Sequence, residues 1–377
     1  MSLKMLGILT WYKTYNYGSA LQAYALVSKI NSLGYHAEII QYFPNENRLP
    51  FLRLSQFKRV IKRFLPALVR RLFWSQYKIK AKRFDAFFEE SIPQSSKQYT
   101  SVEELRKSCE KYTAYLCGSD QIWTPTIQFL DPVYFLSFVP SSIGKISYAP
   151  SIGSTYIPTE KKSQMRMLIS RIDYLSIREE HGATLVESLC GRRPEVVLDP
   201  TLLKDKIEWE RFAIQPKFSE PYILCYFLGD RRPLREFALR LKKRTGYKLV
   251  VIPTRNKDLF FGDVREIQAG PREFVGLIQN AAYICTDSFH GTIFSINLGK
   301  NFFALQRHEI DDPENQNARL INILSRLDLS SRFITDEKSD ADLKPIDYTS
   351  SKVKLAQERK RSLDYLVNAL ARYKEVE

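Results

Sequence analysis

The sequence predicts an α/β protein made of two doubly wound domains. Its 377 residues exceed the length at which a single hydrophobic core usually stops growing. Short apolar runs of strand length alternate with segments of helical periodicity, which favours parallel sheets covered by helices. The composition, 44% hydrophobic and 13% aromatic, supplies enough apolar surface to bury a core in each domain.

The first half of the chain opens with a β-α-β unit. Residues 5–11 form an apolar strand, residues 20–33 have the apolar spacing of a helix that ends before Gly34, and residues 36–42 form a second strand. Further short strands are predicted at 114–117, 146–149, 174–177 and 196–198, with helices at 158–170 and 179–190.

The second half repeats this alternation after Pro216. Strands are predicted at 222–228, 248–252, 283–286 and 302–305, and helices at 234–245, 272–280 and 290–298. We therefore expect an N-terminal domain over 1–205 and a C-terminal domain over 206–340, with a helix in 341–377 that packs back on the first domain. Two such domains in tandem place their strand ends around a shared cleft, where open α/β sheets bind ligands.

A basic segment interrupts the first domain. Residues 48–83 contain twelve Lys or Arg and no Asp or Glu, while the whole chain has a formal net charge of +15. Apolar residues recur there at helical spacing, which predicts an amphipathic helical hairpin, broken near Pro66, as an insertion over 48–90. Peripheral docking on the inner surface of the membrane and packing of the apolar stripe on the protein remain equal alternatives. Nucleic acid is an unlikely partner, because no recognition motif accompanies the charge.

The sequence lacks the motifs that usually mark several classes of protein. No apolar run is long enough to span a bilayer and no signal-peptide pattern is visible, so we expect a cytoplasmic protein. The five cysteines are scattered without a CxxC pair, which predicts reduced core residues and no metal site. P-loop, GxSxG, HExxH and GxGxxG patterns are absent. The sequence predicts no particular oligomeric state.

The strongest candidate site lies in residues 286–292, TDSFHGT, where a buried strand ends and a helix begins. Backbone N–H groups at a helix start favour anions, and Ser288 and Gly291 stand at that start. His290 could serve as an acid or base beside a bound phosphate. A helix-capping Asp or Ser beside a satisfied histidine remains the alternative.

A second candidate is Arg178, which also follows a predicted strand. A guanidinium can grip a phosphate or carboxylate in fork geometry, although an ion pair with a neighbouring Glu is equally compatible with this position. Asp199 stands before a proline further along the chain, which favours a turn.

Two further strand ends carry polar residues. Asn16 and Gly18 lead into the first helix, where backbone N–H groups could receive an acceptor sugar or an anion, or where the glycine serves only to turn the chain. Ser119 and Asp120 follow another strand, and this carboxylate could hydrogen-bond a sugar or accept a hydroxyl proton. An Asx-type turn is the alternative there.

Six segments in order resemble the polysaccharide pyruvyl transferase family: NYGSALQAYAL, CGSDQIW, SYAPSIG, LSIREEHGATL, VVLDPTLL and TDSFHGTIFSI. The resemblance covers roughly residues 5–305. It implies two Rossmann-like domains facing a cleft in a GT-B-like arrangement, with the acceptor on the first domain and the donor on the second. It also implies phosphoenolpyruvate as donor substrate without a cofactor, and ketal formation on two hydroxyls of a sugar or lipid-linked oligosaccharide in cell-surface or exopolysaccharide biosynthesis.

The same resemblance assigns roles to particular residues. His290 matches the family histidine and is expected to act as general acid, and Arg178 matches an arginine associated with phosphoenolpyruvate binding. Many members carry an arginine two residues before the histidine, where this chain has Ser288; Arg307, Arg178 or the helix start could take its place. Asp120 is the candidate base.

Two rival functions remain open at this point. One is a GT-B-like glycosyltransferase that uses a nucleotide sugar, which would share the two-domain cleft. The other is a non-catalytic sugar-binding or membrane-associated protein that has kept the fold, a possibility that Ser288 keeps open.

Overall fold

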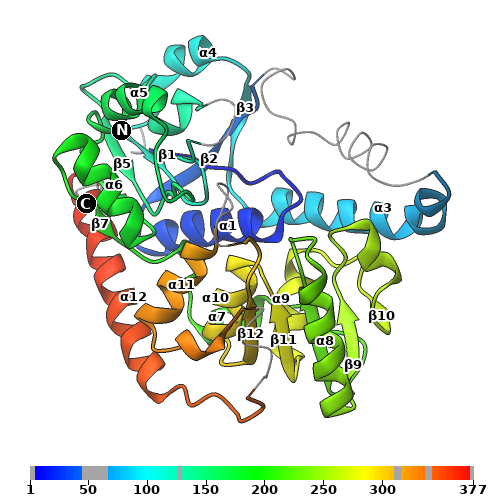
Figure 1. Ribbon diagram of the computed structural model, residues 1–377. Helices are drawn as coiled ribbons and strands as arrows, with labels where there is room; N and C mark the ends of the chain where they lie inside the picture. Colours follow the sequence, from blue (N-terminus) through cyan, green and yellow to red (C-terminus); the bar gives the residue numbers. More distant parts are fainter. Residues whose placement is uncertain (1–4, 45–66, 126–129, 310–315, 336–341, 374–377) are drawn as a thin grey trace. The chain divides into compact units, whose positions relative to one another are not determined.

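The computed structural model describes residues 5–44, 67–125, 130–309, 316–335 and 342–373. It divides the chain into two compact units. The first comprises Met1–Arg53, Phe88–Leu203 and Ala356–Glu377, and the second comprises Leu54–Phe87 and Lys204–Leu355. Each unit has its own parallel sheet with helices packed against it (Figure 1). No helix among these residues is both long enough and apolar enough to cross a membrane.

The first unit has a Rossmann-like sheet. Its strand order is β3-β2-β1-β4-β5, and every neighbouring pair is parallel. The central strands are apolar runs that are buried except for Met5, as parallel sheets covered on both faces require. The strands are β1 (Met5–Leu9), β2 (His36–Tyr42), β3 (Gln94–Tyr99), β4 (Ala114–Cys117) and β5 (Gly144–Ser147), and a separate small sheet pairs β6 (Ser176–Ile177) with β7 (Glu195–Val196).

Helices of the first unit start and stop at recognisable signals. Helix α1 (Tyr17–Ser32) begins after the capping residue Asn16, and α6 (Glu180–Cys190) ends at Gly191, whose φ of 67° lies in the left-handed region that glycine tolerates. The others are α4 (Val102–Lys107) and α5 (Thr159–Ile169).

The second unit repeats the Rossmann-like order with one more strand. Its sheet runs β10-β9-β8-β11-β12-β13, again with parallel neighbours. The strands are β8 (Tyr222–Tyr226), β9 (Lys248–Val251), β10 (Val264–Arg265), β11 (Tyr283–Thr286), β12 (Asn301–Leu305) and β13 (Phe333–Ile334). The helices are α7 (Lys206–Phe212), α8 (Arg232–Thr245), α9 (Pro271–Asn280), α10 (Phe289–Asn297) and α11 (Asn317–Arg326). The predicted α/β class with two Rossmann-like domains is confirmed.

The basic insertion differs from its expected place. Residues 48–66 lie outside the described residues, and the remainder forms one helix, α3 (Ala67–Ser91). Most of α3 belongs to the second unit and not to the first, because Phe73 and Trp74 pack against Leu259 and Ile267 there. Helical periodicity revealed the apolar stripe but not the surface that covers it.

The last helix, α12 (Thr349–Leu370), begins in the second unit and ends in the first. In the first unit Ser362 Oγ accepts a hydrogen bond from the N–H of Leu198, and Tyr365 donates to the carbonyl of Ser147. Near its start, Ser351 donates to the carbonyl of Leu327. The helix therefore contributes contacts to both cores.

Candidate functional site

Each sheet has one point where the strand order reverses. In the first unit this switch point lies between β1 and β4, and in the second between β8 and β11. Ligands of open parallel sheets bind in the crevice outside the carboxyl ends of the strands at such a point. Most of the candidate residues follow these very strands: Asn16, Gly18, Ser119 and Asp120 in the first unit, and Ser288, His290 and Gly291 in the second.

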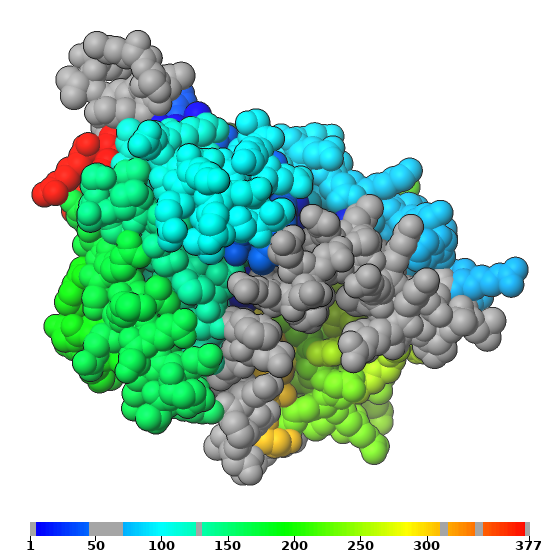
Figure 2. All heavy atoms as spheres, turned by 90° about the horizontal axis from the view of Figure 1, so that it is seen from above, coloured from blue at the N-terminus to red at the C-terminus, as the bar shows by residue number. Residues whose placement is uncertain are grey.

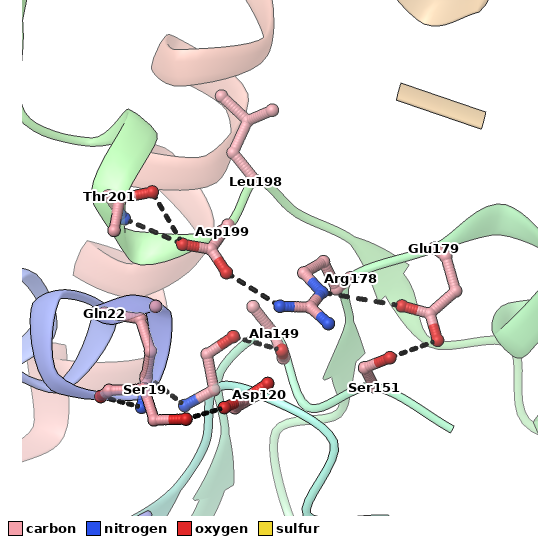
Figure 3. A network of polar contacts seen from close by, with 12 residues as sticks. Ser19, Gln22, Asp120, Ala149, Ser151, Arg178, Glu179, Leu198, Asp199 and Thr201 are labelled. Carbon is pink, nitrogen blue, oxygen red and sulfur yellow. Dashed lines mark hydrogen bonds and ion pairs between the residues drawn. The ribbon is translucent and has the colours of Figure 1, made fainter. Parts of the chain in front are cut away.

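At the first switch point, helix α1 is tied to the end of β4. Ser19 Oγ donates to Asp120 Oδ2 over 2.6 Å (Figure 3). The side-chain amide of Gln22 donates to Thr10 Oγ1 and accepts from the N–H of Ser119. Asp120 has a positive φ of 69°, a conformation that Asp tolerates better than most residues. Its carboxylate is thus held on the helix side of the strand ends.

Three of the predicted binding residues form hydrogen bonds within the chain itself. Asn16 Oδ1 accepts hydrogen bonds from the N–H groups of Gly18 and Ser19, so the chain itself occupies the donors that were expected to receive a ligand. Ser119 is fully buried, and its hydroxyl donates to the carbonyl of Ala149. This geometry favours a structural role for Asn16, Gly18 and Ser119.

Arg178 lies between two carboxylates beside this network. Its Nη1 donates to Asp199 Oδ2 over 2.8 Å, and its Nε is 3.8 Å from Glu179 Oε2 (Figure 3). Burial alone would lower the pKa of Arg178, but the charges of Asp199, Glu179 and Asp120 outweigh burial and raise it. The guanidinium therefore stays charged although its side chain is only 3% exposed.

The acids around Arg178 are themselves held in place. Glu179 Oε1 accepts from Ser151 Oγ and from the N–H of Ile152, and Asp199 Oδ1 accepts from both donors of Thr201. The turn predicted at Asp199 is thus present, and the same side chain also forms the closer ion pair. The sequence pointed to a neighbouring Glu as partner, because Asp199 becomes adjacent only through the pairing of β6 with β7.

At the second switch point, His290 lies in the first turn of α10 and is 7% exposed. Ser288 caps this helix by accepting from the N–H of Gly291 over 3.3 Å. A Cβ on Gly291 would lie 2.6 Å from Thr286 Oγ1, so only glycine allows the helix to approach β11 this closely. Ser288 and Gly291 therefore position His290.

Asp287 connects the two strands that flank this switch point. It is 1% exposed, and its two oxygens accept from the N–H groups of Leu228 and Gly229 at the end of β8. Arg307, after β12, donates from Nε to the carboxylate of Asp287 over 3.2 Å and from Nη2 to its carbonyl over 2.7 Å. Arg307 is thus fixed beside the start of α10.

Sequence reasoning missed further basic residues at this edge. Arg231 donates to the carbonyl of Gln306, and Arg255 donates twice to the carbonyl of Leu228. Each follows a strand of the same sheet, which is the signal that could have identified them. Gln22 was missed in the first unit, where a polar residue within the apolar run of α1 was the available clue.

The two edges differ in their charged groups. The first has three carboxylates around Arg178, and the second has Arg307 beside Asp287 near a helix start. Among the described residues no three His, Cys, Asp or Glu side chains gather as metal ligands would. Because Arg178 belongs to the first unit and His290 to the second, their convergence on one gap stays a prediction.

Comparison with solved structures finds distant likenesses along nearly the whole chain. A UDP-GlcNAc 2-epimerase of Methanocaldococcus jannaschii is 12% identical with a TM-score of 0.48, covering 94% of this chain and 99% of its own. The Neisseria meningitidis enzyme bound to UDP-GlcNAc is 13% identical at 0.46, covering 97% and 100%. An E. coli heptosyltransferase with ADP is 11% identical at 0.38, covering 94% and 99%. These values are too low to bear on function.

No curated protein sequence matches the chain. A family model does: the model described as polysaccharide pyruvyl transferase matches residues 16–309, which include most of both units. The match begins at the cap of α1 and ends just after Arg307, so all the candidate residues fall inside it. The chain belongs to the polysaccharide pyruvyl transferase family.

Proposed function

We propose that this chain transfers the pyruvyl group of phosphoenolpyruvate to two hydroxyls of a sugar residue, forming a ketal and releasing phosphate. The observation that carries the proposal is the Asp287–Arg307 pair beside His290 at the start of α10. A guanidinium and an imidazole near the edge where a Rossmann-like sheet receives its ligand support this proposal. A phosphate ester that must be protonated on carbon needs both groups.

In this mechanism His290 delivers a proton to C3 of phosphoenolpyruvate, so that C2 becomes electrophilic. A sugar hydroxyl then attacks C2 and gives its proton to Asp120, which Ser19 orients. The bond between C2 and the phosphate oxygen breaks, phosphate leaves, and a second hydroxyl closes the ketal. Of the two protons lost by the sugar, one replaces the proton given by His290 and the other leaves with phosphate.

Arg178 is proposed to contact an anionic group of the donor. Asp199 and Glu179 orient the guanidinium, so a bound anion would share it with Asp199. Arg307 is proposed to supply the cation that many members carry at the position of Ser288. The acceptor would be a sugar or lipid-linked oligosaccharide on the cytoplasmic side, in cell-surface or exopolysaccharide biosynthesis.

Calorimetric titration tests the donor without knowledge of the acceptor. We expect heat on addition of phosphoenolpyruvate and none with UDP-GlcNAc, and we expect Arg307→Ala and Arg178→Ala each to weaken the binding. With a competent acceptor, inorganic phosphate should be released. Binding of the nucleotide sugar, with release of a nucleoside diphosphate, would instead support a glycosyltransferase. Absence of heat with both ligands would support a non-catalytic scaffold.

A further inference from the structure

Helix α3 has one face that the second unit covers. Phe73, Trp74 and Tyr77 pack against Leu259 and Ile267. The apolar aromatic stripe of the basic segment is therefore occupied by the protein itself. Any partner of this helix must use the remaining face.

The remaining face combines basic and aliphatic side chains. On a helix of 3.6 residues per turn, its exposed positions fall within an arc of about 120°. The basic residues lie along one edge of this arc and the aliphatic residues along the other. Toward the end of the helix this face carries the exposed Glu89 and Glu90. Between positions 71 and 82 its members are Arg71, Leu72, Ser75, Lys78, Ile79 and Lys82, of which Leu72 is 60% and Ile79 38% exposed. We call this set the basic-aliphatic stripe.

The charges of this stripe are not neutralised locally. Among the described residues, no carboxylate forms an ion pair with Arg71, Lys78 or Lys82, whereas Arg83 on the covered side pairs with Glu273. The nearest acidic residue along the helix is Asp85, and none precedes it back to position 48. Light-blue side chains of α3 project from the molecular surface in Figure 2. The stripe thus presents cations and aliphatic groups to solvent.

We infer that the basic-aliphatic stripe binds an anionic lipid surface with α3 lying in the plane of the membrane. Three lysine or arginine side chains complement anionic headgroups, and each adds about fivefold to partitioning. Leu72 and Ile79 supply the apolar contact with the acyl region that an interfacial helix needs. A nucleic acid would satisfy the cations but has no use for two exposed aliphatic side chains in line with them. This inference goes beyond the proposed transfer and does not depend on it.

Co-sedimentation of the full chain with vesicles tests the inference. We expect binding to vesicles of 30 mol% phosphatidylglycerol in phosphatidylcholine and little binding to phosphatidylcholine alone. The charge-reversal pair Lys78→Glu and Lys82→Glu should weaken partitioning by at least about 25-fold, since each removed cation is worth about fivefold and each added anion repels the surface. The pair Leu72→Ser and Ile79→Ser should also weaken partitioning to the vesicles. The binding that remains in this variant should still decrease with added salt, because its cations are unchanged.

Matched controls carry the same chemical changes elsewhere. Lys162→Glu with Lys243→Glu gives the same change in net charge at exposed positions on α5 and α8, and Met167→Ser removes a side chain that is 62% exposed. These variants should bind vesicles like the unaltered chain. Circular dichroism verifies that all variants fold.

Two results would overturn the inference. Equal losses from the α3 charge pair and the control charge pair would mean that only net charge matters. The second result has two parts. The Leu72→Ser, Ile79→Ser variant would bind vesicles like the unaltered chain, and duplex DNA with the same total negative charge as the vesicles would displace the protein from them. Such a result would identify a general polyanion site instead of a lipid surface.

Discussion

The two switch points share a topology and differ in their charges. At the first, Arg178 is surrounded by the carboxylates of Asp120, Glu179 and Asp199, one positive charge against three negative. At the second, the buried acid Asp287 is satisfied by two backbone N–H groups and by Arg307. Strand order fixes where a ligand can lie, and the side chains at the strand ends decide which ligand it can be.

This difference gives the two arginines different proposed roles. Carboxylates hold Arg178 in place before any ligand arrives, so a donor anion would share its guanidinium with Asp199. Arg307 lies on the outer side of Asp287 with 15% of its side chain exposed, so it can still approach an anion. The predictions below either separate these roles or show that they are the same.

The largest effect is expected from His290→Ala. Removal of a positioned general acid lowers kcat by about 10²- to 10⁴-fold, and unfolding should be unchanged. Phosphate release from phosphoenolpyruvate in the presence of acceptor measures the rate. The exposed His36, replaced in the same way, is the control and should keep full activity. Wild-type turnover in His290→Ala would remove the imidazole from the mechanism.

Asp199→Ala should destabilise the first unit by about 3–5 kcal/mol, because it leaves the buried guanidinium of Arg178 without its closest carboxylate. Urea denaturation measures the loss. Glu220→Ala breaks a solvent-exposed pair with Lys248 and should cost far less. Similar values for both variants would show that Arg178 is not held by its acids.

Arg307→Ala should raise the Kd for phosphoenolpyruvate by about 10- to 100-fold, as expected for loss of a charge-assisted hydrogen bond to an anion. Calorimetry gives the Kd. Arg240→Ala removes an exposed arginine from α8 and should leave the Kd unchanged. If only Arg178→Ala changes the Kd, the donor binds at the strand ends of the first unit. The second unit would then not be the donor side.

The smallest effect concerns Lys80, a buried cation of the second unit. Burial lowers its pKa from 10.5 to about 8, in contrast to Arg178, whose acidic neighbours raise its pKa. Between pH 8 and pH 10.5, Lys80 is protonated in the unfolded chain and largely neutral in the folded chain. The unfolded chain therefore binds more protons, and the free energy of unfolding rises with pH. The expected gain is about 1 kcal/mol between pH 7.5 and 9.

Lys80→Met tests this origin of the pH dependence. The variant should be more stable at pH 7.5 and should lose most of the rise, as followed by urea denaturation at several pH values. Lys82→Met changes an exposed residue of the same helix and should keep the rise. A rise that persists in Lys80→Met would assign it to other groups.

The positions of the strand ends were predictable from the sequence. Runs such as β8 and β11 are largely apolar, and capping residues mark the start of α1 and α10. Local periodicity therefore placed Asp120, Arg178 and His290 at strand or helix ends. The polar edge strand β3 was missed, because only its ends and Ser95 are shielded and its apolar signal is weak.

The amino-acid sequence by itself thus determined the α/β class with two Rossmann-like domains and the family. Only the tertiary structure decided that Asp199 faces Arg178, that Arg307 reaches Asp287 and that α3 turns its aromatic face toward Leu259. The physical reason is that periodicity records which residues are buried locally. The partner of a buried charge depends on which strands become neighbours, and that is a property of the assembled sheet.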